Sequence, residues 1–379
     1  MSEVNAVSQV LDAAEDERFM RAAISLARRG LGQTSPNPAV GALVVRDGVI
    51  VGRGWTQKGG RPHAEPLALA EAGEAAKGAT LYVTLEPCSH HGKTPPCAEA
   101  IVAAGVARVV SAVEDPDSRV AGRGHALLAA HGIAVTHGVL ARDARRANLG
   151  HMLRVTQNRP MVTLKLAETA DGYVAGTAHD PRLSITGAAA NAQVHVARTM
   201  HDAIMVGIGT VLADDPLMTV RLPGLEESQP LRVVLDTHLA FPLNSRLAET
   251  ARDVPVLVIT GPESSATKAH DIRQTGVEVA HVGLDSSGHV DLQQSLALLA
   301  ERGLTRVFSE GGPRVAERLI ALGLADDIVL YTSVKPLGRT GVAALSSAAR
   351  AALADPLHYV LAETGMVGAD RRRCYERVL

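Results

Sequence analysis

The spacing of apolar and polar residues predicts an ordered series of strands and helices in the first 140 positions. Apolar residues recur at helical spacing from Asp16 to Arg29 and stop at Gly30, which predicts a helix over 16–29. Apolar runs at 40–45 and 49–51 flank Asp47-Gly48, a pair typical of a β-hairpin turn. Helices are then expected over 64–77, 98–104 and 125–130, and strands over 80–85, 107–113 and 133–136. This alternation predicts a sheet with helices on both faces.

A second alternating series follows a polar, Arg-rich stretch at 141–158, which we expect to be a helix or a linker. Arg159-Pro160 ends that stretch, because the residue before a proline leaves the helical region. Beyond it, strands are predicted over 161–167, 203–206, 231–235, 256–259, 305–309 and 328–331, and helices over 188–199, 292–302 and 315–322. We therefore expect two α/β domains, residues 1–158 and 159–379, with no internal repeat relating them.

Length and charge narrow the classes of function. The 379 residues suit two domains rather than one at about 150 residues per domain. Hydrophobic residues (46%) and charged residues (21%) lie near the averages for globular proteins, which excludes disorder and coiled coil. A net charge of −2, no basic block and 2% aromatic residues argue against nucleic-acid binding. We expect a small-molecule substrate instead.

The cysteines and the N-terminus suggest a cellular compartment. Three cysteines in a chain of this length cannot form a disulfide scaffold, which indicates a reducing compartment. The first residues lack the features of a secretory signal, and no apolar stretch approaches the roughly 20 residues of a membrane-spanning helix. We expect a cytoplasmic protein with no membrane association. Cys374 has no partner in the sequence pattern and is taken as a free thiol.

The first half contains a candidate zinc site. His63 and Glu65 lie where a helix is predicted to begin, Cys88 follows a predicted strand, and Cys97 opens the next helix. One imidazole and two thiolates suit zinc, and three protein ligands leave a fourth position for water. The start of a helix would favour the thiolate of Cys97, and Glu65 is the candidate that moves the proton of that water. A closed structural site, with His90 or His91 as fourth ligand, is the alternative.

Two glycine-rich turns in the second half are candidate phosphate sites. No Gly-x-Gly-x-x-Gly motif opens a βαβ unit here, so a standard dinucleotide-binding fold has no support. Gly207-Ile208-Gly209-Thr210 and Glu310-Gly311-Gly312 each follow a predicted strand, and Pro313 then stands in the first turn of a helix. Glycines allow a phosphate to approach free backbone N–H groups. Each turn could equally be only a tight connection between a strand and a helix.

The zinc candidates belong to a longer pattern. His-x-Glu followed by Pro-Cys is similar to the signature of zinc nucleobase deaminases. PCSHHGKTPPC, with SPNPAVGALVV before it and DPDSRVAGRG after it, resembles the deaminase domain of the bifunctional riboflavin-biosynthesis deaminase/reductase family over residues 16–138. The resemblance implies a cytidine-deaminase-like three-layer α/β/α fold, one zinc per chain on His63, Cys88 and Cys97, and catalysis by Glu65. It implies substrate contacts from Asn37, His90, Lys93 and Asp115. The chain departs from the family pattern at Thr56, often His, and Asp117, commonly Asn.

The second half resembles the reductase domain of the same family through LKLAETADG, VGIGTVLADDPLMTVR and SEGGPRVAERLIALG. This implies a dihydrofolate-reductase-like α/β fold that uses NADPH. By family position, the cofactor would be lined by Ala167, Ser184, Thr210, Asp214, Thr237, Gly312, Pro313, Arg314, Val315, Ala316, Glu317 and Arg318. The substrate would be lined by Lys165, Arg182, Arg198, Met218, Arg221 and Glu310. Arg198 and Arg221 could offer forked donors to a phosphate. Ser184 stands where many relatives have Trp.

The resemblance implies a bifunctional enzyme of riboflavin biosynthesis. Its first half would remove the ring amino group of a diamino-hydroxy-phosphoribosylamino-pyrimidine with the help of zinc. Its second half would reduce the ribosyl chain to ribityl with NADPH, and a homo-oligomer, dimer or tetramer, is the family expectation. Two alternatives remain open at this point: a nucleoside or nucleic-acid zinc deaminase with an appended binding domain, and a metal-stabilised interaction module.

Overall fold

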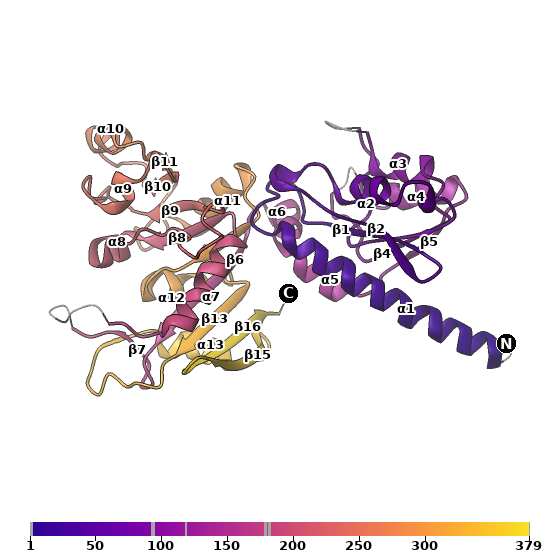
Figure 1. Cartoon of the computed structure of the whole chain (residues 1–379). Helices are drawn as coiled ribbons and strands as arrows, with labels where there is room; N and C mark the ends of the chain where they lie inside the picture. Colours follow the sequence, from indigo (N-terminus) through magenta and orange to yellow (C-terminus); the bar gives the residue numbers. More distant parts are fainter. Residues whose placement is uncertain (1–2, 92–94, 118–119, 178–179, 181–182, 379) are drawn as a thin grey trace. The chain divides into compact units, whose positions relative to one another are not determined.

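The chain forms two compact units, Met1–Asn158 and Arg159–Leu379, each described by itself. The structure is a computed structural model, and it describes residues 3–91, 95–117, 120–177, 180 and 183–378. Both units are mixed α/β (Figure 1). No helix in the described part of the chain has the length and apolar character needed to cross a membrane.

The first unit is a three-layer α/β/α domain, as predicted. Its sheet has the order β2-β1-β3-β4-β5, formed by β1 (Gly41–Arg46), β2 (Val49–Trp55), β3 (Thr80–Val83), β4 (Arg108–Ser111) and β5 (Ala134–His137). β1 runs antiparallel to both neighbours, whereas β3, β4 and β5 are parallel. One face carries α1 (Glu3–Ala27) and α5 (Ala141–Ala147); the other carries α2 (Ala64–Ala72), α3 (Cys97–Ala103) and α4 (Arg123–Ala130) (Figure 1).

Glycines in β2 bring α2 close to the sheet. A Cβ at Gly54 would lie 2.2 Å from the Ala64 carbonyl oxygen, and one at Gly52 would lie 2.1 Å from the Ala68 carbonyl oxygen. Neither backbone oxygen can move without displacing the helix, so only glycine fits at these two positions. This close approach fixes the first turn of α2, where Glu65 lies.

The second unit is built on a nine-stranded sheet. Its order is β11-β10-β9-β8-β12-β6-β13-β16-β15, with strands β6 (Met161–Glu168), β8 (Ala203–Gly207), β9 (Leu231–Leu235), β10 (Val256–Thr260), β11 (Glu278–His281), β12 (Arg306–Ser309), β13 (Asp327–Thr332), β15 (Tyr359–Val367) and β16 (Asp370–Arg377). The first seven strands in this order are parallel, and β16 and β15 add an antiparallel hairpin. A separate pair joins β7 (Tyr173–Ala175) to β14 (Val342–Ala343).

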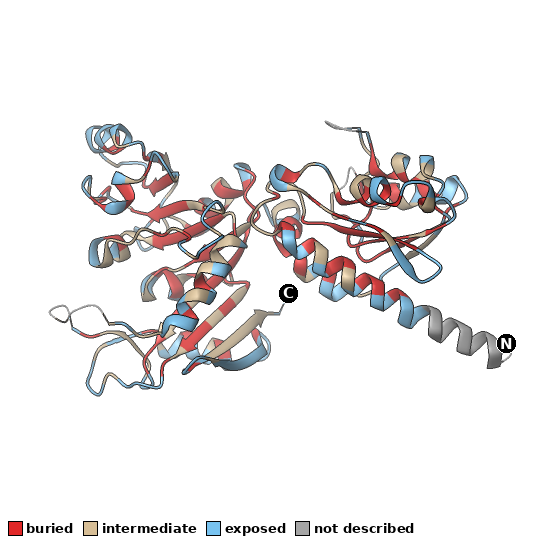
Figure 2. Cartoon of the chain, in the orientation of Figure 1, coloured by how far each residue is buried: buried red, intermediate tan, exposed pale blue. Residues whose placement is uncertain are grey.

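Helices connect the strands of the second unit. They are α7 (Ala188–Thr199), α8 (Ile208–Asp214), α9 (Arg246–Glu249), α10 (Ala266–Gln274), α11 (Leu292–Glu301), α12 (Pro313–Ala321) and α13 (Ser347–Ala354). The buried residues follow the strands and the inward faces of these helices (Figure 2). Parallel strands joined by helices place the loops after their carboxyl ends along one edge of the sheet. The predicted site residues of this unit lie largely along that edge.

The elements differ from the sequence predictions in several places. The first helix begins at Glu3 rather than Asp16, and it ends in a short 3₁₀ turn at Arg28–Gly30. The Arg-rich stretch 141–158 forms two helices, α5 and α6 (Leu149–Gln157). The glycine turn after β8 opens into α8, and the C-terminal β15–β16 hairpin was not predicted at all.

A buried carboxylate attaches α1 to the sheet. Asp16 is 5% exposed and accepts two hydrogen bonds from the Arg108 guanidinium, at 2.9 and 2.6 Å, and one from the Tyr82 hydroxyl at 2.9 Å. Burial and the Asp16 hydrogen bond raise the pKa of Tyr82, which therefore stays a donor. The carboxylate thus links α1 to β3 and β4.

We predict that Asp16→Ala lowers the free energy of unfolding of the first unit by about 2 kcal/mol, because the substitution leaves Arg108 and Tyr82 without their acceptor. Trp55 is the chain's one tryptophan and lies in β2, so its fluorescence during urea unfolding reports this unit. Glu17→Ala is the control, because Glu17 is exposed and 3.7 Å from Arg21; its effect should stay below about 0.5 kcal/mol. Equal effects of the two substitutions would contradict the anchoring role of Asp16.

Candidate functional site

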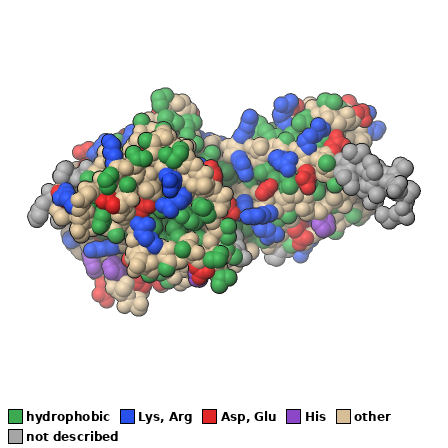
Figure 3. All heavy atoms as spheres, turned by 90° about the horizontal axis from the view of Figure 1, so that it is seen from below, with side chains coloured by type: hydrophobic (Ala, Val, Ile, Leu, Met, Phe, Trp, Pro, Cys, Tyr) green, Lys and Arg blue, Asp and Glu red, His purple; other side chains and the backbone are tan. Residues whose placement is uncertain are grey.

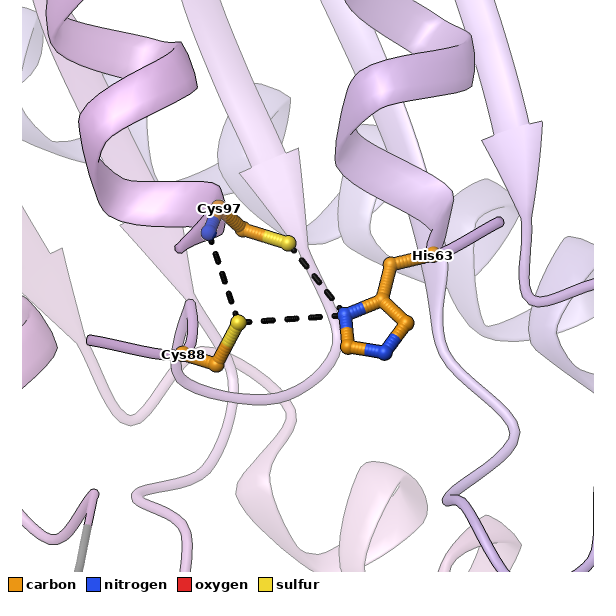
Figure 4. A group of neighbouring side chains, drawn as sticks. All are labelled: His63, Cys88 and Cys97. Carbon is orange, nitrogen blue, oxygen red and sulfur yellow. Dashed lines mark hydrogen bonds between the residues drawn. The ribbon is translucent and has the colours of Figure 1, made fainter. Parts of the chain in front are cut away.

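Three metal-ligating side chains converge in the first unit. His63 precedes α2, Cys88 follows β3, and Cys97 is the first residue of α3. Their side chains point toward one another, and His63 Nδ1 faces both sulfur atoms (Figure 4). The ligand atoms of all three lie within 4.8 Å of one another. The structure therefore brings the three predicted ligands together.

The spacing of these atoms fits zinc. His63 Nδ1 lies 3.3 Å from Cys97 Sγ and 3.8 Å from Cys88 Sγ. Zinc bonded to nitrogen and sulfur at its usual bond lengths and tetrahedral angles separates the two atoms by about 3.6 Å. One imidazole and two thiolates at this separation are thus a donor set that zinc can occupy with little rearrangement.

The start of α3 acts on Cys88 rather than on Cys97, which corrects the sequence expectation. The backbone N–H of Cys97 donates to Cys88 Sγ at 3.3 Å. The Cys97 thiol donates to the same sulfur, and with the contribution of His63 this lowers the pKa of Cys88 to about 4. The hydrogen bond to Cys88 and burial in turn raise the pKa of Cys97. Cys88 is therefore the more acidic thiol of the two, and its sulfur lies at the start of α3 although eight residues separate it from Cys97.

Glu65 lies beside these ligands but is not one of the three. It is 3% exposed, in the first turn of α2, and hydrogen-bonds with the Cys97 side chain. Burial and the negative charge of Cys88 raise its pKa to about 7. A carboxyl group with a pKa near neutrality can both accept and release a proton, which is the property that general acid–base catalysis requires.

The described residues supply no fourth ligand at this site. His90 and His91 do not join the group of three within 4.8 Å, and His91 is exposed near Glu99. A site with three protein ligands leaves one position for water or substrate. The arrangement therefore favours a catalytic site over the closed structural alternative.

The predicted substrate residues of the first unit lie on loops beside the metal ligands. Asn37 donates from Nδ2 to the Gly60 carbonyl oxygen at 2.8 Å, three residues before His63. The backbone N–H of Asp115 donates to Glu86 Oε2 at 3.3 Å, two residues before Cys88. His90 follows Cys88, and its Nδ1 is buried with no hydrogen-bond partner among the described residues. Lys93 lies outside the described residues.

The two departures from the family pattern have structural partners. Thr56 is 2% exposed, and its Oγ1 accepts the Val40 backbone N–H at 3.0 Å, so it holds the start of β1. Asp117 donates from its backbone N–H to Asp115 Oδ1 at 2.9 Å. Thr56 therefore acts as a structural residue here, and Asp117 helps to orient Asp115.

The sequence analysis missed Glu86, which organises this site. Its carboxylate accepts backbone N–H groups of Asp115, Gly122, Gly124 and His125 at 2.9–3.3 Å. The signal available in the sequence was an acidic residue directly after a mostly apolar strand, where an unpaired charge would be costly.

Two neighbouring strands of the second unit each lead into the start of a helix. β8 and β12 are adjacent and parallel, and their carboxyl ends lead into α8 and α12. A Cβ built on Gly312 would lie 3.6 Å from Thr210 Oγ1, so the two helix starts face each other. The N-terminus of a helix is a general binding position for phosphate, and two such starts side by side suit the diphosphate of a dinucleotide. The described residues therefore fit a cofactor such as NADPH.

The other predicted cofactor residues differ in accessibility. Ala167, Asp214, Thr237 and Pro313 are half-buried near strand ends or helix ends, whereas Ser184, Arg314 and Glu317 are exposed. Val315 and Ala316 are buried in the hydrophobic core, so only their backbone could meet a cofactor. Arg318 donates to Asp285 Oδ2 at 2.6 Å and to the Val290 carbonyl oxygen at 2.7 Å, so its guanidinium is engaged within the protein.

The predicted substrate residues form a charged cluster in the second unit. Arg198, in the last turn of α7, makes a two-pronged pair with Glu310 at 2.6 and 3.0 Å and reaches the Thr219 carbonyl oxygen at 2.7 Å. Burial opposes the ionisation of Glu310, but Arg198 and Lys165 outweigh it, so the pKa of Glu310 lies below its ordinary value. Arg221 is exposed beside this cluster.

His195 is a member of this cluster that the sequence analysis missed. Its Nδ1 accepts the Arg221 backbone N–H at 3.1 Å, and burial together with Arg198 and Arg221 lowers its pKa. It stands three residues before Arg198 on α7, the spacing that places two side chains on one helix face.

Met218 is a predicted substrate residue whose side chain is buried. It is 3% exposed within the hydrophobic core, and its φ of 51° turns the backbone away from a helical course. Its side chain therefore packs against apolar neighbours, so only its backbone could meet a substrate, and its assignment stays a prediction. Arg182 lies outside the described residues.

The fold and the two sites define a two-domain enzyme class: a zinc-type deaminase joined to a reductase. Residues 13–113 match the family model "Cytidine and deoxycytidylate deaminase zinc-binding region", and residues 160–357 match "RibD C-terminal domain". The chain belongs to the riboflavin biosynthesis protein RibD family, whose members combine a zinc-binding deaminase domain with a reductase domain typical of NADPH use. The predicted fold class, bifunctional activity and cofactors are thereby confirmed.

Individual relatives support this assignment over nearly the whole chain. The Escherichia coli RibD protein is 38% identical over 368 residues, covering 94% of this chain and 98% of its own, and the Aquifex aeolicus protein is 42% identical over 323 residues, covering 85% and 88%. The structure of Acinetobacter baumannii RibD, form 1, has a TM-score of 0.84 at 34% identity, covering 97% of this chain and 100% of that one. These matches leave no support for a nucleic-acid deaminase or an interaction module.

We predict that the purified protein holds about one zinc per chain and that Cys88→Ser loses most of it, because the substitution removes the most acidic thiol of the donor set. Zinc is measured by atomic emission on dialysed protein. Cys374→Ser is the matched control, since Cys374 lies in β16 in the second unit and should leave the zinc content unchanged. Full zinc in the Cys88 variant would contradict the assigned donor set.

Proposed function

We propose that the first unit hydrolyses the ring amino group of 2,5-diamino-6-(5-phosphoribosylamino)pyrimidin-4(3H)-one, and that the second unit reduces the ribosyl chain of the product with NADPH. A Thermotoga maritima protein, whose structure has a TM-score of 0.82 at 33% identity, is named as the corresponding deaminase and reductase. The observation that carries the proposal is the open three-ligand site with Glu65 buried beside it. We also expect this protein to work as a cytoplasmic homodimer or homotetramer.

In the first unit, Glu65 performs the proton transfers. Zinc bound by His63, Cys88 and Cys97 would lower the pKa of a water at the site to about 7. Glu65 takes the proton from the attacking water and gives it to the departing amino group, so that the ring carbon gains oxygen and ammonia leaves. Its near-neutral pKa suits both transfers.

In the first unit, the loops next to the metal-binding residues orient the substrate. The Asn37 amide is held by Gly60 and the Asp115 backbone by Glu86, each two or three residues from a metal ligand, so both residues keep a fixed place beside the metal site. His90 adds a buried nitrogen that has no partner among the described residues. Such fixed positioning raises the rate because little orientation is left to achieve in the transition state.

In the second unit, the protein binds and aligns the two reactants. NADPH supplies the hydride. The facing starts of α8 and α12 bind its diphosphate, while Lys165, Arg198 and Glu310 hold the opened sugar. Arg221 is exposed, and its guanidinium donates to Thr219 and forms no salt bridge with any described residue, so it can bind the substrate phosphate.

We predict that Glu65→Gln lowers kcat for ammonia release by roughly 10² to 10⁴, because the amide cannot carry the proton. The zinc content and NADPH oxidation with the deaminated intermediate should stay at wild-type values, since the two sites lie in different units. Glu74→Gln, an exposed change shortly after α2, is the control. Retained ammonia release in the Glu65 variant would overturn the proposed role of Glu65.

We predict that Arg221→Ala raises KM for the deaminated phosphorylated substrate by roughly 10-fold or more, the usual worth of a hydrogen bond to a charged group. The Kd for NADPH, measured by fluorescence, should not change. Arg221 is a cleaner test than Arg198, whose removal would leave the partly buried Glu310 without its partner. Arg252→Ala, at an exposed position of the same unit, is the control. An unchanged KM in the Arg221 variant would show that Arg221 does not bind the substrate phosphate.

A further inference from the structure

Helix α6 contacts both loops that flank the metal site of the first unit. His151, in its first turn, lies with Nε2 3.2 Å from Asp115 Oδ1. Arg154, one turn later, lies with a guanidinium nitrogen 3.5 Å from the Pro36 carbonyl oxygen, next to Asn37. Neither contact is local, because each joins residues more than thirty positions apart in the chain. The helix therefore bridges the two loops on which the site depends.

The loop of Asp115 is attached to the metal ligands from the other side. β3 and β4 are parallel, with Val83 opposite Ser111, so Cys88 and Asp115 both follow strand ends at one edge of the sheet. The Asp115 backbone N–H is bound by Glu86, just before Cys88. These contacts fix the backbone of Asp115, but they do not fix the rotation of its carboxyl group.

Two contacts determine that rotation. Asp115 is 7% exposed, and its Oδ1 receives both the Asp117 backbone N–H, at 2.9 Å, and His151 Nε2. Among the described residues, Oδ2 has no hydrogen-bond partner, so it is the oxygen left to accept from a bound molecule. Because Asp115 can only accept at Oδ1, the proton of this contact belongs to His151 Nε2.

The surroundings of His151 indicate a polar site rather than an apolar core. His151 is 8% exposed, and its Nδ1 is buried with no partner among the described residues. Asn148, three residues earlier, is 3% exposed, and both polar atoms of its amide also lack partners within the described part of the chain. Buried polar groups without partners are costly, and their presence on one helix beside Asp115 indicates hydrogen bonds that a bound molecule or water completes.

We propose that His151 is a positioning residue of the deaminase site: it holds Oδ1 of Asp115 so that Oδ2 faces the substrate's polar groups. The proposal rests on the proposed deaminase function, and it assigns His151 to substrate affinity rather than to proton transfer. Loss of the His151 donor frees the carboxyl group to rotate, which weakens binding and leaves the chemistry at Glu65 and the metal ligands intact.

The test compares His151→Phe, which keeps a ring without the donor, with His151→Gln, which restores an N–H donor. We expect the Phe variant to raise KM for the pyrimidine substrate by roughly 10-fold, the usual worth of a hydrogen bond to a charged group. Its kcat should change less than about threefold, and the Gln variant should stay within about threefold of wild type in both constants. Zinc content and NADPH oxidation in the second unit report that each variant is folded.

A double-mutant cycle with Asp115→Asn tests whether His151 acts through Asp115. In that background, His151→Phe should have little further effect on KM, because the carboxylate it positions is gone. An unchanged KM in the Phe variant, a fall confined to kcat, loss of zinc in both variants, or full additivity in the cycle would overturn the proposal. Absence of ammonia release from the wild-type protein would instead reject the proposed function itself.

Discussion

The deaminase site depends on the buried carboxylate of Glu86. A carboxylate removed from water is costly unless donors surround it, and Glu86 receives four backbone N–H groups from the loop after β4 and the start of α4. Gly124 completes the contact, because a Cβ there would lie 2.0 Å from the Pro87 carbonyl oxygen. The segment that leads to Cys88 is thereby locked to the segment that carries Asp115, and the metal ligands and substrate loop keep one geometry.

In the second unit, a buried ion-pair cluster and the proposed site lie at opposite ends of the strands. At the amino ends of β6 and β13, Asp326 is fully buried and bound by Arg159, Arg377 and the Val162 backbone N–H. At the carboxyl ends of the parallel strands lie the starts of α8 and α12 and the Arg198–Glu310 pair. The face shown in Figure 3 has Lys and Arg side chains interspersed with acidic and apolar ones, in keeping with the net charge of −2.

The sequence predicted the metal donors well, because each stands at the junction of a strand and a helix where the apolar pattern changes. It also predicted the central strands, because their residues are apolar on both faces. It missed α8, in which Val211 is the buried residue, and β15, whose residues are mostly exposed, since neither has the burial that creates a periodic pattern. Met218 was assigned from the family resemblance, which did not indicate that its side chain would be buried. Glu86, His195 and His151 were missed because their partners are distant in the sequence.

The two units together imply an ordered pair of reactions on one phosphorylated substrate series. A single time course on the unmodified protein, supplied with the diamino-pyrimidine phosphate and NADPH, tests this account most directly. The account predicts that ammonia appears first, that NADPH oxidation follows after a lag, and that the two amounts become equal at completion. NADPH oxidation without ammonia release, or ammonia release with no NADPH oxidation thereafter, would contradict it.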